Sequence, residues 1–529
     1  MTDPLDPRAV RSLTERLVAI PSVSPDPAGE DACASCIEAA LADAGGAGAV
    51  HAGHWPASDG RRIVWWLLRG GSPRAVLCLA HHDTVGVEEY SALGSADGHA
   101  LAFSPEPLRE RMLTLASRRD PALSPGTLTD LAEEYRRPGT WMFGRGALDM
   151  KSGIAAGIAA CRALASGGEA ADGSLLFVSS PDEEVHSAGM LAAVPRLVEL
   201  AEQHGLEWAG ALNLDYANDP VMHVGVAGKL LVQLWVLGAP THASAPFRGV
   251  DASQLAAAIV SRATLDPGLV DAPPGGAGSP PVVLRLRDLK PRYDVQTALE
   301  AVIELNLITC QRPLTATLAA LKRVTAEAMV ALARSMGALR RSTAPNEPML
   351  DSSVPRVLTY PELVALARVA GDPLGERPLE FGSNLREPTL ERVRRLARAA
   401  GIGGPAVVIT LLPPCYPHAA PGHGPLVRAA RAVAARHRRT VRDYYPHISD
   451  ASYVAWRGEG PGRVAEYLPA LGREYALPAR AIAALDLDVV TLGPWGRDAH
   501  GLSERVHAPD AFGTLPRLIV ETVRAAWST

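Results

Sequence analysis

Continuous apolar runs alternate with helical patterns along most of the chain. Runs without alternation predict strands covered on both faces, at residues 63–68, 75–80, 174–179, 209–214 and 487–492. Apolar residues at helical spacing predict helices, at residues 7–20, 128–135, 154–164, 426–437 and 515–527. The residues 447–450 are expected to open a further helix. This alternation is typical of an α/β domain with a doubly wound, mixed sheet.

The pattern changes at about residue 228. Strands are expected at 230–237, 282–286, 301–308 and 406–411, and helices at 251–262, 315–334, 360–369 and 388–399. We interpret residues 228–416 as an α+β domain inserted into a catalytic domain, whose two parts are 1–227 and 417–529. The mixed segment 86–137 is expected to be an insertion that either shapes the substrate site or decorates the surface.

Composition narrows the class of protein. A chain of 529 residues is too long for one core. The net charge of −5 comes without a basic block, which argues against nucleic-acid binding. The most apolar helix is short and ends beside Arg162, and the acidic N-terminus carries no apolar run. We therefore expect a soluble, cytoplasmic protein that binds neither nucleic acid nor membrane.

Ionisable residues follow the ends of several predicted strands. His81 comes directly after one strand, Glu184 and Asp215 follow two others, and His500 lies in the loop after a late one. Asp149 lies in a glycine-rich turn that leads into a helix. In open α/β sheets the carboxyl ends of the strands form the ligand-binding edge, where a fold itself needs no ionisable residue.

These residue types and their number suit a metal site. Imidazole and carboxylate ligands without cysteine favour zinc, with cobalt or manganese as alternatives. Two divalent ions need one bridging carboxylate and further ligands on each side. The ligand candidates are His81, Asp149, Glu184, Asp215 and His500. Glu183 is a further carboxylate, expected to act as a base.

Four segments, each weak alone, together resemble a known family. They are 80–83 (Ala-His-His-Asp), 144–151 (Gly-Arg-Gly-Ala-Leu-Asp-Met-Lys), 182–184 (Asp-Glu-Glu) and 499–500 (Ala-His). Their types and order are similar to those of the co-catalytic zinc metallopeptidases that include carboxypeptidase G, aminoacylase, succinyl-diaminopimelate desuccinylase and peptidase T. The segments 86–137, 287–296 and 447–450 more closely resemble the arginine utilisation protein branch, whose name suggests an arginine-derived substrate.

The resemblance implies a role for each candidate. It assigns the ligands as His81 and Asp215 for one metal, Glu184 and His500 for the other, and Asp149 between them. Asp83 would orient His81 without binding a metal. Glu183 would take a proton from the metal-bound water and pass it to the leaving amine. A cis peptide bond after Asp149 is also implied.

The inserted domain carries one further candidate. His242 lies in a segment, 238–246, that resembles the lid of the family, where this histidine stabilises the oxyanion in the partner subunit. The resemblance therefore implies a lid and dimerisation domain and a homodimer. Arg248, Arg287 and Arg312 are candidates for binding a substrate carboxylate, and the sequence does not choose among them.

Two functions follow from these patterns. The first is a metal-dependent hydrolase that cleaves an amide bond of a small peptide or N-acyl amino acid substrate. The alternative is a catalytically silent metal-binding or regulatory protein on the same fold. The presence of Glu183 and Asp83 favours the enzyme, since a silent relative has no need of either residue.

Overall fold

The computed structural model describes residues 3–43, 49–93, 98–166, 172–273, 276–352, 354–371, 385–457, 461–470 and 475–529. The chain divides into two compact units. Unit 1 comprises Met1–Val226, Ala419–Ala455 and Arg480–Thr529, and unit 2 comprises Ala227–His418 and Trp456–Ala479.

The segment 456–479 corrects the sequence-based domain boundaries. The sequence pattern assigns it to the second part of the catalytic domain, whereas it belongs to unit 2. The reason is its contacts with the central strand β12 (Ala406–Tyr416): the backbone N–H of Cys415 donates to the Tyr475 hydroxyl at 3.0 Å, and the Thr410 hydroxyl donates to the Tyr467 carbonyl at 3.1 Å.

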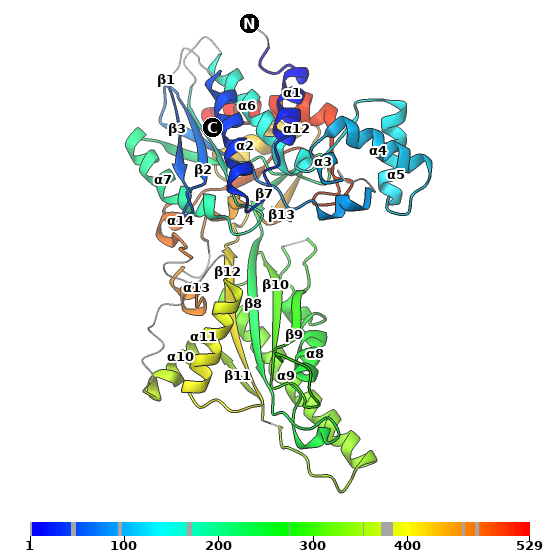
Figure 1. The fold of residues 1–529 in the computed structure, drawn as a ribbon. Helices are drawn as coiled ribbons and strands as arrows, with labels where there is room; N and C mark the ends of the chain where they lie inside the picture. The colour runs from blue at the N-terminus through cyan, green and yellow to red at the C-terminus, as the bar shows by residue number, and fades with distance from the viewer. Residues whose placement is uncertain are drawn as a thin grey trace. The chain divides into compact units, whose positions relative to one another are not determined.

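Unit 1 is built on an eight-stranded mixed sheet of order β1-β2-β5-β3-β6-β14-β7-β13. Figure 1 labels strands β1, β2, β3, β7 and β13 of this sheet. Its strands are β1 (Ala49–Pro56), β2 (Arg62–Arg69), β3 (Arg74–His81), β5 (Ser174–Ser180), β6 (Glu207–Asn213), β7 (Val221–Val226), β13 (Thr440–Tyr445) and β14 (Val489–Thr491). The three central strands β5, β3 and β6 run parallel, and the outer pair β1 and β2 is antiparallel.

Helices cover both faces of this sheet. Alternate residues of a strand point to opposite faces, and in β3 Val76 and Cys78 join the main core while Leu77 and Leu79 are buried outside it. The main core is shared by α1 (Pro7–Val18), α2 (Pro27–Ala42), α6 (Ser152–Ala165), α12 (Pro425–Arg436) and α15 (Leu515–Ser528). The helix α7 (Ala188–His204) lies outside that core and contacts β1, β2 and β5. The sheet is therefore doubly wound, as predicted.

The predicted insertion has a hydrophobic cluster of its own. It contains η1 (Glu88–Leu93), α3 (Gly98–Leu101), α4 (Pro105–Ser117) and α5 (Pro125–Arg136). These elements pack with β4 (Trp141–Phe143), which pairs with β16 (Arg505–His507) and through it with β15 (Gly496–Arg497). Residues 94–97 of the insertion lie outside the described part of the chain.

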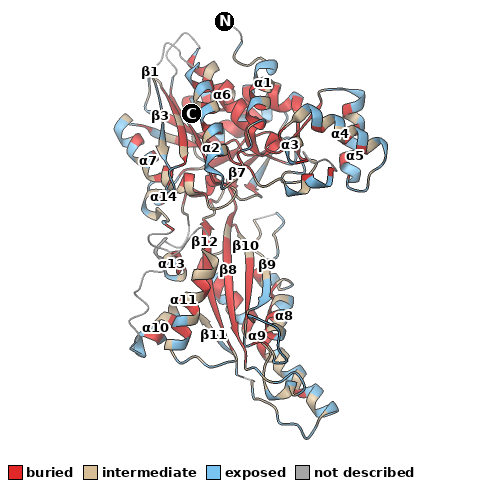
Figure 2. Cartoon of the chain, viewed as in Figure 1, coloured by how far each residue is buried: buried red, intermediate tan, exposed pale blue. Residues whose placement is uncertain are grey.

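Unit 2 contains a five-stranded sheet of order β11-β12-β8-β10-β9. Its elements are β8 (Gly228–Leu237), η3 (Pro246–Arg248), α8 (Ala252–Ala263), η4 (Pro267–Leu269), β9 (Val282–Asp288), β10 (Glu300–Thr309), α9 (Leu314–Thr343), β11 (Arg356–Thr359), α10 (Tyr360–Val369), α11 (Arg386–Ala399), β12 and α13 (Pro461–Tyr467). Figure 2 shows that β8, β10 and β12 are buried, whereas the edge strand β9 is exposed along much of its length. The helix α9 continues nine residues beyond the predicted end at residue 334.

Other elements differ from the sequence pattern. The helix expected to open at 447–450 is only the short 3-10 turn η6 (Asp450–Val454), followed by extended backbone at Ala455. The remaining short elements of unit 1 are η2 (Ala147–Lys151), α14 (Ala479–Leu485) and η7 (Asp510–Thr514). Among the described residues, no helix has both the length and the apolar character required to cross a bilayer.

Candidate metal centre

Three neighbouring strands deliver the predicted residues to one edge of the sheet in unit 1. In the parallel register of β3, His81 lies opposite Ser180 of β5, and Leu79 lies opposite Asn213 of β6. Segment 182–184 follows β5 directly, and Asp215 follows β6. The sequence-based expectation that the carboxyl ends of the strands gather these side chains is therefore matched by the topology.

The turn η2 adds Asp149 to this edge. Gly146 precedes it in the left-handed region, at φ 77°, and a Cβ there would lie 2.8 Å from Thr84 Cγ2. A glycine is therefore required for the turn to approach this closely. The Asp149–Met150 peptide bond is cis, as the family resemblance implies.

Asp149 directs one carboxylate oxygen to each of two histidines. Its Oδ1 lies 3.0 Å from His81 Nε2, and its Oδ2 lies 3.0 Å from His500 Nε2. His500 Nε2 also lies 3.0 Å from Glu184 Oε1. Within the described part of the chain, ligand atoms within 4.8 Å of one another form two groups, His81–Asp149–Asp215 and Asp149–Glu184–His500. Asp149 is the shared member, which is the position of a bridging ligand.

Asp83 supports both sides of the cluster. Its Oδ1 lies 3.4 Å from Nδ1 of His81, so that the opposite ring nitrogen faces Asp149. Its two carboxylate oxygens accept the backbone N–H groups of Glu183 and Glu184, each at 3.1 Å. The buried carboxylate thus lies beside one imidazole and accepts two backbone N–H groups of the acidic turn. His82, in contrast, bonds Ser179, and burial lowers its pKa to about 3.

The cluster carries more negative charge than its surroundings compensate. Burial, together with the nearby charge of Asp149, raises the pKa of Glu184 and of Asp215 to about 7. Burial also raises the pKa of Glu183 well above its ordinary value. Burial alone would lower the pKa of His500, but its carboxylate partners raise it to about 11. Buried carboxylates that depend on added positive charge, next to imidazole nitrogens, fit divalent cations, so the residues present suit two such ions.

His242 lies in unit 2, whereas the five candidate ligands, Asp83 and Glu183 lie in unit 1. Its ring is exposed, and its Nδ1 accepts the backbone N–H of Ser244 at 3.1 Å. In the neutral imidazole this leaves the proton on Nε2, which is then a hydrogen-bond donor.

The three candidate arginines of unit 2 each have a protein partner. Arg312 donates to the backbone carbonyls of Gly268 and Val270, and therefore supports the chain between them. Arg287 pairs with Glu387 at 2.9 Å, and Arg248 pairs with Glu347 at 3.3 Å. These contacts do not single out any of the three as a receptor for a substrate carboxylate.

The structure also reveals site residues that the sequence analysis did not assign. Glu504 is buried, and its Oε1 accepts the N–H groups of Leu148 and Asp149 at 3.1 and 3.3 Å. His447 stacks on Tyr216, the residue after Asp215, with ring centroids 4.9 Å apart. Glu504 lies four residues after His500, and this closeness in sequence could have marked it as a candidate site residue. Nothing in the spacing indicates that it binds the backbone of Leu148 and Asp149.

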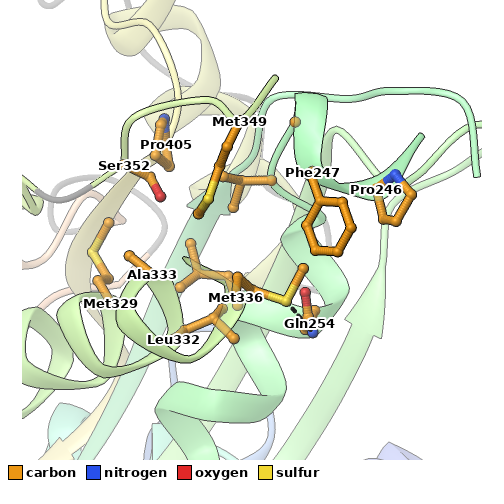
Figure 3. Close-up of a pocket in the computed structure, with 13 residues that line it drawn as sticks. Pro246, Phe247, Gln254, Met329, Leu332, Ala333, Met336, Met349, Ser352 and Pro405 are labelled. Atoms are coloured by element: carbon orange, nitrogen blue, oxygen red, sulfur yellow. Dashed lines mark hydrogen bonds between the residues drawn. The ribbon is translucent and has the colours of Figure 1, made fainter. Parts of the chain in front are cut away.

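A pocket in unit 2 has different chemistry. It has an empty volume of about 440 Å³ and is lined by methionine, leucine and phenylalanine side chains with Gln254 and Ser352 (Figure 3). Gln254 Nε2 donates to Met336 Sδ at 3.6 Å. None of the lining residues is ionisable, so this pocket offers no acid, base or metal ligand.

Comparisons with known proteins agree with the fold and the motifs. The model of the family described as peptidase family M20/M25/M40 matches residues 125–478. The uncharacterized protein YqjN of Bacillus subtilis (strain 168) is 29% identical over 497 residues, covering 89% of this chain and 87% of that protein. Protein RocB of the same organism is 27% identical over 486 residues, covering 86% of this chain and 82% of that protein.

A solved structure shows the same fold. The aminopeptidase PepT of Bacillus cereus superposes with a TM-score of 0.54 at 13% identity, covering 98% of this chain and 99% of that one. At this identity the likeness concerns the fold alone. Together with the family model, it confirms the predicted α/β architecture with an inserted domain and the family resemblance drawn from the four segments.

Proposed function

The chain belongs to the peptidase family M20/M25/M40, and from this premise we propose that it cleaves an amide bond of a small peptide or N-acyl amino acid. Metal-dependent hydrolysis of peptide or amide bonds is the general activity of such a chain. The observation that carries the proposal is the pair of ligand groups that share Asp149.

Five side chains of unit 1 would hold the metals in this proposal. His81 and Asp215 would hold one ion, Glu184 and His500 the other, and Asp149 would be shared by both. Nitrogen and oxygen donors without thiolate favour zinc, with cobalt or manganese as alternatives. Ions in such a site supply a Lewis acid that polarises the scissile carbonyl and a water that is nucleophilic at neutral pH.

Glu183 is the proposed general base. It is buried beside the ligand groups and directly precedes Glu184 in the sequence. A carboxylate at this position could take a proton from the attacking water and then deliver it to the leaving amine. Asp83 keeps this residue in place through the Glu183 backbone N–H.

We further propose a homodimer formed through unit 2. The edge strand β9 exposes Val282, Leu284 and Leu286, and among the described residues no strand pairs with its outer backbone edge. Exposed apolar edge strands are prone to pair with another chain. In this arrangement the Nε2–H group of His242 would donate a hydrogen bond to the oxyanion formed in the partner subunit.

The hydrolase proposal is tested with metal-loaded protein. Wild-type protein reconstituted with zinc, cobalt or manganese should hydrolyse members of a panel of N-acyl amino acids and dipeptides. Glu183→Gln should retain its metals and lose hydrolysis, because an amide cannot accept the proton. Measured turnover and metal content separate the two effects. A metal-loaded wild type that cleaves no panel member would favour the catalytically silent alternative.

A further inference from the structure

We infer that Arg145 is a positioning residue that holds the Asp149 turn and the His500 loop in register and ties both to the first turn of the insertion. The inference rests on the proposed metal-binding roles of Asp149 and His500. It goes beyond that proposal because, within the described residues, the Arg145 side chain bonds none of the five proposed ligand side chains.

The Arg145 side chain is buried, with only 1% of its surface exposed, yet it donates to four acceptors. Its Nη1 donates to Glu504 Oε2 at 2.6 Å, and its Nη2 donates to the His500 carbonyl at 3.1 Å. Its Nε donates to the Gly86 carbonyl at 3.1 Å, and Nη2 also donates to Glu89. One guanidinium therefore joins the loop 500–504 to the segment 86–89.

Glu504 connects Arg145 to the backbone of Asp149. One of its carboxylate oxygens bonds Arg145, and the other accepts the N–H groups of Leu148 and Asp149. Arg145 thus positions the His500 loop through a direct hydrogen bond, and the Asp149 backbone through Glu504. Since Asp149 must face two histidines at once, a small shift of either segment would separate the two ligand groups.

The insertion provides further contacts to the Arg145 guanidinium. Tyr90 is fully buried in the insertion's own hydrophobic cluster, and its ring centroid lies 5.6 Å from Arg145 Cζ. This distance is typical of a cation–π contact. Together with Gly86 and Glu89, it shows that the first turn of the insertion, η1, is attached to the metal-site loops rather than only decorating the surface.

Arginine is required by this geometry. Four acceptors that approach from two segments need donors spread over a planar fork, which a guanidinium provides. A lysine preserves the positive charge but places its three protons on one nitrogen, so it cannot reach both sides. Arg145→Lys therefore removes the planar arrangement of hydrogen-bond donors and keeps the positive charge.

A matched control is present in the same unit. Arg439 is also largely buried and pairs with a carboxylate, Asp510, but it contacts none of the candidate ligands in the described structure. Arg439→Lys reports the cost of weakening a buried ion pair alone. A purely structural role of Arg145 would make the two lysine variants behave alike.

The test combines three measurements on full-length Arg145→Lys and Arg439→Lys. These are cobalt binding followed by its visible absorption, the kcat and KM of the zinc-loaded protein, and the thermal unfolding of the metal-free protein. We expect similar metal-free melting temperatures for both variants. Only Arg145→Lys should show altered cobalt absorption, with cobalt affinity or kcat lowered by about tenfold or more and KM little changed.

A second variant guards against misfolding. Glu89→Gln weakens the ion pair between Glu89 and Arg145 at its more exposed partner. It should change cobalt affinity and kcat in the same direction as Arg145→Lys, by a smaller factor. Wild-type cobalt spectra and kcat in Arg145→Lys, or equal losses in Arg439→Lys, would overturn the inference. A wild-type protein that binds no cobalt or zinc would overturn the proposed function and this inference together, whereas the first outcome leaves the proposed function intact.

Discussion

Asp149 depends on contacts from distant parts of the chain. Its side chain faces His81 and His500, while its backbone N–H is held by Glu504. Hydrogen bonds and charge from the histidines outweigh the effect of burial and lower its pKa, so Asp149 is ionised. An ionised carboxylate with one oxygen toward each ligand group is the form that a bridging role requires.

The proposed role of Asp83 in orienting His81 can be tested separately from the ligands. Asp83→Asn removes the charge beside Nδ1 of His81 and offers an amide in place of one acceptor of the acidic turn. We expect metal affinity or kcat to fall by about 10- to 100-fold without loss of the fold. Calorimetric zinc titration and steady-state kinetics measure the two quantities. Wild-type values for both would show that Asp83 does not position this histidine.

The central strands were the most predictable elements. The apolar runs of β3, β5 and β6 are continuous because both faces of these strands are buried. For the same reason their ends could be placed closely enough to bring His81, Glu184 and Asp215 to one edge. In contrast, β7 and β13 were not predicted, since His223 and Gly225 interrupt the first and exposed polar residues dominate the second.

The supporting contacts of the site could not be predicted. The Arg145 side chain bonds Glu504, which is 359 positions further along the sequence, and spacing within a motif carries no information about so distant a partner. The lone arginine between two glycines gave no sign that it would be buried. The exposed β9 strand, although predicted as a strand, gave no sign of being at an edge.

A buried histidine on β7, His223, is expected to make stability depend on pH. Burial and the charges of Arg442 and His447 lower the pKa of His223 to about 4, and its Nδ1 has no hydrogen-bond partner among the described residues. Because the unfolded chain binds this proton near pH 6.5, the free energy of unfolding falls as the pH drops from 6.5 toward 4. The loss from this group is about 2 kcal/mol between pH 7 and pH 5.

His223→Phe tests that effect by removing the titrating group. Urea unfolding of the metal-free wild type and variant at pH 7 and pH 5 isolates its contribution, since both proteins keep the same candidate ligands. We expect the variant to lose about 2 kcal/mol less than the wild type on acidification. Equal losses in the two proteins would show that His223 is not held neutral by the fold.

The proposed homodimer is a property of the whole molecule. Leu284 of β9 is 52% exposed, and Val282 and Leu286 of the same strand are also exposed. Leu284→Asp should dissociate the dimer, because a carboxylate would be buried without a partner at the interface. Light scattering after size exclusion gives the mass. Leu339→Asp, at a residue 50% exposed on α9, is the control and should remain dimeric.

Two outcomes would contradict that assembly. A monomeric wild type would remove it, and with it the proposed role of His242 in a partner subunit. A Leu284→Asp variant that stays dimeric would place the interface away from β9. The hydrolase proposal would survive either result, since the candidate ligands all lie in unit 1.

The most direct test of the central claim is the metal content of purified, reconstituted protein, measured by inductively coupled plasma mass spectrometry. The two ligand groups that share Asp149 predict two ions per chain in the wild type. Asp149→Ala is expected to retain fewer than one, because it removes the bridge from both groups. One ion per chain in the wild type, or two in Asp149→Ala, would contradict a dinuclear centre built around Asp149.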